Sequence, residues 1–270
     1  MGKMIKLKTI EACNYKCSYC VAGRVGFSGQ RLDDLHGLQR LFCFLRPPWR
    51  VSFTGGEPFL HPRLSEIVKL AVAEGHTVDI GTNLSAPLSD FLKVAQVAGA
   101  ALKSIRASFH AESVSFDEFA GKLALVSEAL GSATKVSARF VVRPGNHWDL
   151  AMIERRIQAL GLSVRFQPQR RNGQVLRIDP EDKRAIEMCR LHNPVSPHNN
   201  CGSKCSAGSM YLRVDTRGDV YPCNEFKRLG MVSLFSLRSD VMALLGEPVT
   251  CPSARYCCVQ PQEKGMIVNI

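Results

Sequence analysis

Apolar residues in the first 170 positions alternate between two periods, one typical of strands and one typical of helices. Runs rich in β-branched and aromatic side chains predict strands over residues 4–10, 50–53, 77–81, 103–109, 135–142 and 162–167. Between these runs apolar side chains recur at helical spacing, as at Leu35, Leu38, Phe42 and Leu45. The pattern therefore predicts six strand–helix units in a row.

Capping signals mark the ends of several predicted helices. Pro62 stands near the start of one helical stripe, and Gly75 stands just past its end. Ser115 and Glu118 have the spacing of a capping box, and Gly161 closes the stripe that begins at Leu150. Repeated strand–helix units imply an α/β fold with a parallel sheet, either open or closed into a full or partial barrel. In each case the loops after the strands carry the site.

The pattern changes after about residue 178. It predicts in turn a helix over 180–191, a polar loop over 193–204, a β-hairpin over 210–222, a short helix near 232–245 and a cysteine-rich tail. We therefore divide the chain into a first domain over 1–178 and a small α+β domain over 179–270.

Composition narrows the class of protein. The chain has 270 residues, of which 45% are hydrophobic, which suits one large domain with a smaller appendage. No apolar stretch is long enough for a membrane span, and the first residues lack the apolar core of a signal peptide, so we expect the cytoplasm. The formal net charge of +11 points to a nucleic acid or another anionic partner, or to an ordinary solvated basic surface.

Ten of the eleven cysteines fall into two clusters, three within 13–20 and seven within 189–258. A disulfide framework does not suit a long chain without a secretion signal. Cys43 stands alone among apolar residues and is expected to be a core thiol, and Cys189 is expected to pack on a helix. The remaining cysteines are candidates for metal binding.

The first cluster, Cys13, Cys17 and Cys20, follows the first strand directly and so lies in the first strand–helix loop. Three thiolates this close together can hold three irons of a cubane cluster and leave the fourth iron open to a ligand. A structural zinc site would need a fourth ligand, for which His36, on the first predicted helix, is the nearby candidate.

This C-x3-C-x2-C pattern, with the aromatic Tyr19 before its last cysteine, resembles the signature of the radical S-adenosylmethionine (radical SAM) superfamily. The resemblance implies a partial (β/α)6 TIM-like barrel and a [4Fe-4S] cluster whose open iron is chelated by the methionine part of SAM. It also implies one-electron cleavage of SAM to a 5′-deoxyadenosyl radical that abstracts hydrogen from a substrate. The electron would come from a donor such as flavodoxin or ferredoxin.

A second feature is similar to the same superfamily. Gly55, Gly56 and Glu57, followed by proline, come directly after the second strand. On its own this is an ordinary strand–helix turn. Glycines let the backbone approach a ligand closely, and the resemblance implies that this turn and the Glu57 carboxylate hold the methionyl amine of SAM.

Other cofactor contacts follow from the resemblance alone, and each of these positions could instead serve sheet packing or solvation. Thr82 and Asn83 end the third strand, where they would meet the ribose or the carboxylate. Ser108 ends the fourth strand as a polar cofactor contact. Arg139 on the fifth strand would pair with the methionyl carboxylate, and Val141 would pack on adenine.

Residues at the mouth of the site are candidates for binding the substrate. His110, two residues after Ser108, would bind substrate or act as a base, unless it is simply a loop histidine. Arg165, Gln167 and Gln169, on or after the sixth strand, could line the cavity.

The second cluster resembles the SPASM and twitch domains, which carry auxiliary iron–sulfur clusters in radical SAM enzymes. Cys205 and Cys223 flank the predicted hairpin, with Gly218 at the spacing of that element. The chain lacks the full cysteine series of a complete SPASM domain. A shortened domain with one auxiliary iron–sulfur cluster, of the [4Fe-4S] type, is therefore the better match. Our first choice of ligands comprises Cys205, Cys223, Cys251 and Cys257, with Cys201 able to displace either of the last two and Cys258 a further candidate.

The resemblance leaves the substrate open among three classes. A peptide or protein side chain is the leading interpretation, because auxiliary-cluster domains are most often met there. The first alternative is a small molecule such as an amino sugar or aminocyclitol. The second is a nucleotide or nucleic-acid base. A non-enzymatic iron–sulfur relay or a zinc-stabilised binding module is the competing class. We expect no membrane partner.

Overall fold

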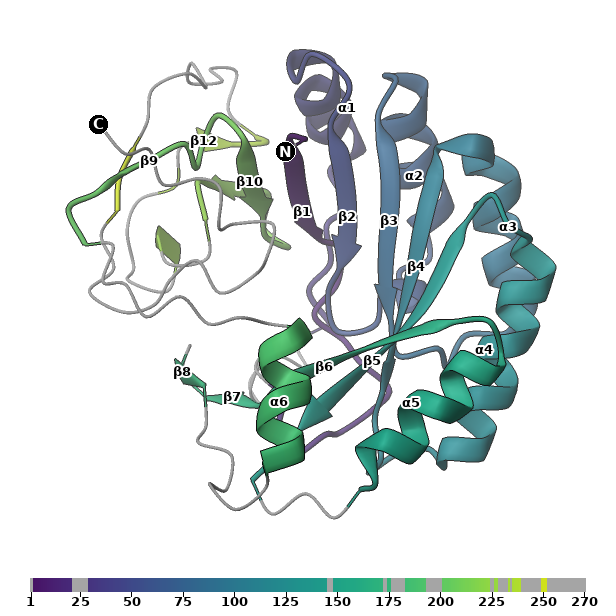
Figure 1. Ribbon diagram of the computed structural model, residues 1–270. Coiled ribbons are helices and arrows are strands. Elements are labelled where there is room, and N and C mark those ends of the chain that lie inside the picture. The colour runs from purple at the N-terminus through teal and green to yellow at the C-terminus, as the bar shows by residue number, and fades with distance from the viewer. Residues whose placement is uncertain are drawn as a thin grey trace.

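The computed structural model describes residues 2–20, 29–144, 148–171, 174–175, 183–192, 201–223, 226–227, 233, 235–238 and 249–251. Six parallel strands follow one another in chain order and form most of one sheet (Figure 1). They are β1 (Met4–Lys8), β2 (Arg50–Thr54), β3 (Thr77–Thr82), β4 (Leu102–Phe109), β5 (Lys135–Val142) and β6 (Ser163–Pro168). The predicted α/β class and all six predicted strands are confirmed.

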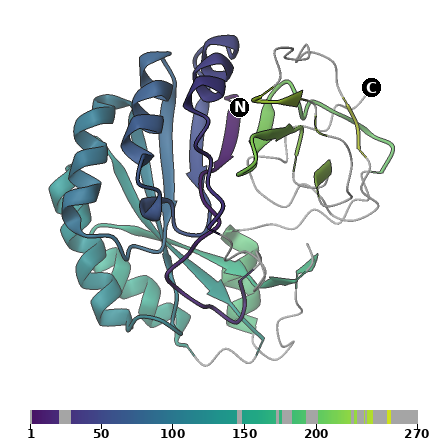
Figure 2. The same cartoon turned by 180° about the vertical axis from the view of Figure 1, so that it is seen from behind.

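The connecting helices lie along one side of the sheet, which leaves the other side open, as in a partial barrel (Figures 1 and 2). They are α1 (Leu35–Phe44), α2 (Leu64–Ala73), α3 (Leu88–Ala98), α4 (Phe116–Leu130), α5 (Leu150–Ala159) and α6 (Lys183–His192), with short 3-10 turns at Pro58–Leu60 and Gly99–Ala101. The capping box of Ser115 and Glu118 is present at the start of α4. None of the described helices has the length and apolar character needed to cross a membrane.

Strand side chains alternate between the two faces of the sheet, and the two faces differ in chemistry. On β5 the side chains of Ala138, Phe140 and Val142 are buried in the main hydrophobic core under the helices. Arg139 between them is only part-buried and points to the open face. The sheet therefore has one apolar face that packs against helices and one polar face that can carry a site.

The hairpin predicted after residue 210 is confirmed, as β10 (Tyr211–Val214) and β11 (Asp219–Tyr221). It adds to the edge of the main sheet: β10 runs parallel to β1, with Ile5 opposite Leu212. The short strand β12 (Phe235–Ser236) follows β11 in the same sheet. The sheet is therefore continuous between residues on the two sides of the division expected near residue 178.

Four two-residue strands of the described part of the chain lie outside this sheet. Strand β7 (Arg170–Arg171) pairs with β8 (Gln174–Val175), and β9 (Lys204–Cys205) pairs with β13 (Val249–Thr250). The second of these pairs lies among the cysteines of the C-terminal region.

Two predictions from the apolar pattern are wrong. The helix expected near 232–245 is contradicted at Phe235, which is in strand β12, with Phe235 and Leu237 buried at strand spacing; residues 239–248 lie outside the described part. Cys43 is exposed, because the buried stripe of α1 passes through Leu38, Leu41 and Phe42 and leaves residue 43 on the solvent side. Cys189 is buried on α6, as predicted.

Candidate functional site

The three N-terminal cysteines lie in one loop directly after β1. The backbone N–H of Cys20 donates to the Cys17 carbonyl oxygen at 3.2 Å, and the N–H of Tyr15 donates to Cys13 Sγ at 3.4 Å. Cys13 and Cys17 are half-buried and Cys20 is exposed. Burial raises the pKa of the Cys13 and Cys17 thiols, and the negative charges of the neighbouring cysteines raise both further.

The mutual repulsion of these thiolates is what a bound cationic cluster would relieve. Within the described part of the chain, no three His, Cys, Asp or Glu side chains converge on a single metal ion. A cubane cluster has a different requirement, since each thiolate binds its own iron and the sulfur atoms stand apart. The three cysteines fit such a cluster by donor type, by number and by their place on one loop.

His110 lies against this loop from the end of β4. Its Nδ1 atom is 3.2 Å from Cys17 Sγ and 3.1 Å from the Tyr19 hydroxyl. The rings of Tyr15 and Tyr19 stand 5.8 and 6.0 Å from the His110 ring, edge-on and stacked respectively. Burial lowers the pKa of His110 to about 4, so the imidazole is neutral at pH 7.

Glu112 and Arg143 attach the far side of the cysteine loop to the ends of β4 and β5. Both carboxylate oxygens of Glu112 accept hydrogen bonds from Ser18, one from its backbone N–H and one from its hydroxyl, each at 2.6 Å. Arg143 donates to Glu112 and lies 5.0 Å from the centre of the Tyr19 ring. The described part of the loop is thus held at its start by β1 and at Ser18 by the Glu112 carboxylate.

The glycine turn after β2 packs against the backbone that leads into the cysteine loop. The N–H of Gly56 donates to the Ile10 carbonyl at 2.8 Å, and the N–H of Glu57 donates to the Ala12 carbonyl at 2.9 Å. A Cβ atom on Gly56 would lie 2.0 Å from the Ala12 oxygen, and one on Gly55 would lie 2.5 Å from the Ile10 oxygen. Both positions therefore need glycine for close backbone contact within the chain.

The Glu57 side chain is fully buried and is held by three donors. One oxygen accepts from the Thr82 hydroxyl at 2.8 Å and from the Phe59 N–H at 3.2 Å, and the other accepts from the Asn83 N–H at 2.6 Å. Burial raises the pKa of Glu57, and these hydrogen bonds oppose that rise. The carboxylate joins the turn after β2 to the end of β3.

Asn83 connects this buried carboxylate to the cysteine loop. Its side-chain N–H2 group lies 3.7 Å from Cys13 Sγ and donates to Asn14 Oδ1 at 2.9 Å. The remaining expected cofactor contacts lie on the open face of the sheet, where Ser108 on β4 stands opposite Arg139 on β5. Val141 stands two residues beyond Arg139 on the same face.

Several C-terminal cysteines also lie close together. Strand β9 places Cys205 opposite Val249, and Cys251 exchanges backbone hydrogen bonds with Gly202 and Ser203. Cys205 and Cys223 belong to one small apolar cluster with Met4, Ala207 and Tyr211. Residues 201–205, 223 and 251 are thus brought together, whereas Cys257 and Cys258 lie outside the described residues.

Comparison with known families decides the identity of this arrangement. Residues 7–124 match the family model described as the radical SAM superfamily. Residues 7–124 thus carry the radical SAM domain. The matched segment runs from β1 through the cysteine loop and the glycine turn into α4.

Curated relatives match only a part of this radical SAM protein. A GTP 3′,8-cyclase of Chlorobaculum tepidum is 35% identical over 83 residues, which are 29% of this chain and 25% of that protein. A 7-carboxy-7-deazaguanine synthase of Aquifex aeolicus is 33% identical over 75 residues, which are 27% of this chain and 33% of that protein. The chain thus spans a third or less of the length of these two relatives.

Solved structures share the fold over most of the chain. Streptococcus suis SuiB bound to S-adenosylmethionine superposes with a TM-score of 0.65 at 13% identity, covering 90% of this chain and 65% of SuiB. Native anSMEcpe with bound AdoMet and the Cp18Cys peptide superposes with a TM-score of 0.60 at 13% identity, covering 98% and 82%. The similarity includes the antiparallel, cysteine-containing C-terminal region.

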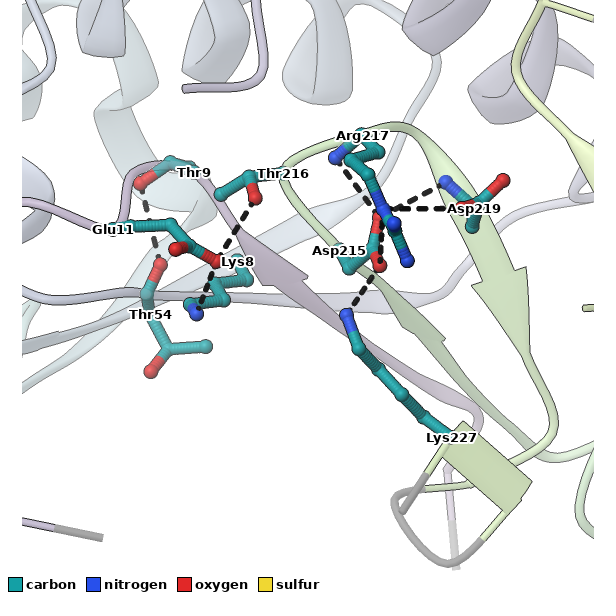
Figure 3. A network of polar contacts seen from close by, with 9 residues as sticks. All are labelled: Lys8, Thr9, Glu11, Thr54, Asp215, Thr216, Arg217, Asp219 and Lys227. Atoms are coloured by element: carbon teal, nitrogen blue, oxygen red, sulfur yellow. Dashed lines mark hydrogen bonds and ion pairs between the residues drawn. The ribbon is translucent and has the colours of Figure 1, made fainter. Parts of the chain in front are cut away.

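Sequence reasoning about this radical SAM protein missed the residues that brace the cysteine loop. Glu112 follows His110 by two residues. Its position just after the end of β4, where the site was expected, was the signal in the sequence that could have identified it. The second brace comes from the C-terminal hairpin: Glu11 Oε1 accepts from Lys8 Nζ at 2.8 Å and from the Thr216 hydroxyl at 3.2 Å (Figure 3). Buried Asp215 beside it accepts from Lys227, so the hairpin turn is itself fixed.

Proposed function

We propose that this chain is an enzyme that reductively cleaves S-adenosylmethionine and uses the resulting 5′-deoxyadenosyl radical to abstract hydrogen from a peptide or protein side chain. The observation that carries the proposal is the cysteine triad after β1, within a segment that matches the superfamily. A cluster bound there would supply an open iron for the cofactor and an entry point for one electron. An electron donor such as a flavodoxin or a ferredoxin is therefore part of the proposal.

We assign the protein's own residues three tasks. Cys13, Cys17 and Cys20 hold the [4Fe-4S] cluster, and the neutral ring of His110 packs beside Cys17 at the mouth of the site. Asn83, Ser108, Arg139 and Val141 contact the cofactor from the strand ends and the open face.

The glycine turn supports the cofactor site through the backbone. Gly55 and Gly56 fix the path of residues 10–12, and so set where Cys13 begins. Because the Glu57 carboxylate is fully buried and holds three donors, we propose that it acts on the cofactor through Asn83. This is an indirect role in place of the direct amine contact that the family resemblance implies.

We also propose one auxiliary iron–sulfur cluster in the C-terminal region, of the [4Fe-4S] type. Cys205, Cys223 and Cys251 are three of its ligands, supported by their proximity around β9 and β13. The fourth ligand is Cys201 or Cys257, of which Cys201 lies next to the Gly202 contact with Cys251. The division into core and auxiliary domains near residue 178 belongs to the same proposal.

The substrate class draws on the relatives. SuiB has been solved bound to its precursor peptide SuiA, and anSMEcpe with the Cp18Cys peptide, which supports a peptide substrate. A second candidate, a nucleotide, is favoured by the GTP 3′,8-cyclases, one of which is 41% identical to this chain over 80 residues.

The test is the release of 5′-deoxyadenosine. The anaerobically reconstituted protein is mixed with S-adenosylmethionine and dithionite, and the product is measured by chromatography. We expect product from the unaltered protein and from Cys43→Ala, an exposed cysteine on α1, and none from Cys17→Ala. Absence of product from the unaltered protein, or equal product from Cys17→Ala, would contradict the proposal.

A further inference from the structure

Three arginines on neighbouring strands point to the open face of the sheet. Arg106 lies on β4, Arg139 on β5 and Arg165 on β6. Arg139 and Arg165 are direct register partners, and Arg106 stands opposite Ser137, two residues before Arg139. Adjacent strands are about 4.8 Å apart, so the stems of Arg139 and Arg165 begin side by side. All three side chains are part-buried.

The acidic group beside these arginines is already engaged. Asp79 on β3 forms an ion pair with Arg50 at 3.0 Å and accepts from the Ser104 hydroxyl at 2.9 Å. Arg106 donates to the Ser52 hydroxyl, and its buried Nε atom has no hydrogen-bond partner within the described structure. Within the described residues, the Asp79 carboxylate is thus shared among the guanidinium groups of Arg50, Arg106 and Arg139.

Arg139 and Arg165 lack a charged partner among the residues that the structure describes. Neither guanidinium forms a hydrogen bond or an ion pair with any residue that the structure describes. Burial, together with the charges of Arg106 and Arg165, lowers the pKa of Arg139 to about 9 against the weaker, opposing effect of Asp79. A cation that is partly withdrawn from water and has no partner is costly, and an anion that pairs with it recovers part of that cost.

The pair lies on the approach to the cysteine loop. Beyond Arg139 and Arg165 on the same face come Val141 and Gln167, which are again register partners. Ser108 stands beside Arg139, and His110, which contacts Cys17, follows it by two residues. A molecule on this face would therefore lie between the arginine pair and the proposed cluster.

Resting on the function proposed above, we propose that Arg165 binds an anionic group of the substrate, a carboxylate or a phosphate, beside Arg139. The proposed function assigns the Arg139 guanidinium to the carboxylate of the cofactor. The single positive charge of Arg139 is then balanced by that one carboxylate. Arg165 is then left facing the same space with its fork free, and that fork matches carboxylate and phosphate oxygens in a bidentate manner. Arg106 adds positive charge beneath both.

The experiment compares small anions as probes on the reconstituted full chain saturated with S-adenosylmethionine. Glutarate supplies a carboxylate and pyrophosphate supplies a phosphate, and calorimetry measures the affinity of each. The variants are Arg165→Gln, Arg165→Lys and a control, Arg155→Gln, which changes an exposed arginine on α5.

We expect the unaltered protein and Arg155→Gln to bind one of the probes equally well. Arg165→Gln should weaken that binding about tenfold or more, since it removes a charge-assisted hydrogen bond, and by more than it weakens cofactor binding. Arg165→Lys should recover part of the loss. Preference for pyrophosphate indicates a phosphorylated substrate, and preference for glutarate indicates an acidic side chain.

Three results would overturn the assignment. They are no binding of either probe by the unaltered protein, equal probe affinity in Arg165→Gln and Arg155→Gln, or a loss of cofactor affinity as large as the loss of probe affinity. Failure of the proposed function looks different: the protein would release no 5′-deoxyadenosine while still binding a probe through Arg165.

Discussion

Replacing Glu57 by glutamine removes one acceptor from a fully buried site while keeping the shape of the side chain. The carboxylate accepts from Thr82, Phe59 and Asn83 at 2.8, 3.2 and 2.6 Å. A glutamine has one oxygen, so in either orientation its amide N–H2 group faces at least one of these donors. That donor is left without an acceptor in a site with 0% solvent exposure.

The expected cost follows from these contacts. Leaving a buried donor unsatisfied costs about 1–3 kcal/mol. Burial raises the pKa of Glu57 despite its hydrogen bonds, which shows that burying the charge is itself unfavourable, and a neutral amide relieves part of that cost. We therefore expect Glu57→Gln to lower the free energy of unfolding by about 1–2 kcal/mol, the lower part of the range.

Urea unfolding followed by circular dichroism measures this difference. The matched control is Glu66→Gln, which changes an exposed carboxylate on α2 and should leave the unfolding midpoint within error of the unaltered protein. Equal midpoints for Glu57→Gln and Glu66→Gln would refute the argument that the buried carboxylate joins β2 to β3.

Two further substitutions test the glycine turn and the C-terminal hairpin that hold the cysteine loop in place. Gly56→Ala should lower both the free energy of unfolding and the amount of iron bound by the N-terminal cysteines, because its Cβ would lie 2.0 Å from the Ala12 oxygen. The control is Gly121→Ala on α4, whose Cβ meets nothing within 4 Å. This control should stabilise the chain by up to about 1 kcal/mol in urea unfolding. An assay of bound iron distinguishes the two variants, and a Gly56→Ala variant that binds as much iron as the unaltered protein would contradict the prediction. Asp215→Asn should lower the free energy of unfolding near pH 7 by about 1–3 kcal/mol, because it removes a buried acceptor of Lys227. Burial alone would raise the pKa of Asp215, but Lys227 and the backbone donors hold it below its usual value of 3.8, so this stabilisation is present above pH 3.8 and is lost as the pH falls through the depressed pKa. Urea unfolding should therefore show the gap from the unaltered protein closing in acid, and a constant gap would contradict the assignment.

Local patterns were sufficient for the elements of the core. The apolar alternation over Lys135–Val142 predicted β5 with the bounds it has, and the capping box at Ser115 predicted the start of α4. Both signals act between residues close in sequence, so they can be read without a partner. The error at Phe235 arose where strand and helix spacing are hard to separate over a few apolar residues.

Long-range contacts were beyond such patterns. The pairing of β10 with β1 joins residues near position 212 to residues near position 5, and no local period encodes it. The same holds for Glu57, whose acidic side chain suggested a ligand contact but whose donors come from the end of β3. The arginine pair on β5 and β6 also required the register of the two strands.

The most direct test of the central claim is the electron paramagnetic resonance spectrum of the reduced protein with and without S-adenosylmethionine. A Cys205→Ala/Cys223→Ala variant removes the proposed auxiliary cluster, so that the signal reports the N-terminal cluster alone. We predict a [4Fe-4S] signal that changes on adding the cofactor, because the fourth iron has no protein ligand and is open to it. No signal, or a signal identical with and without the cofactor, would contradict the account.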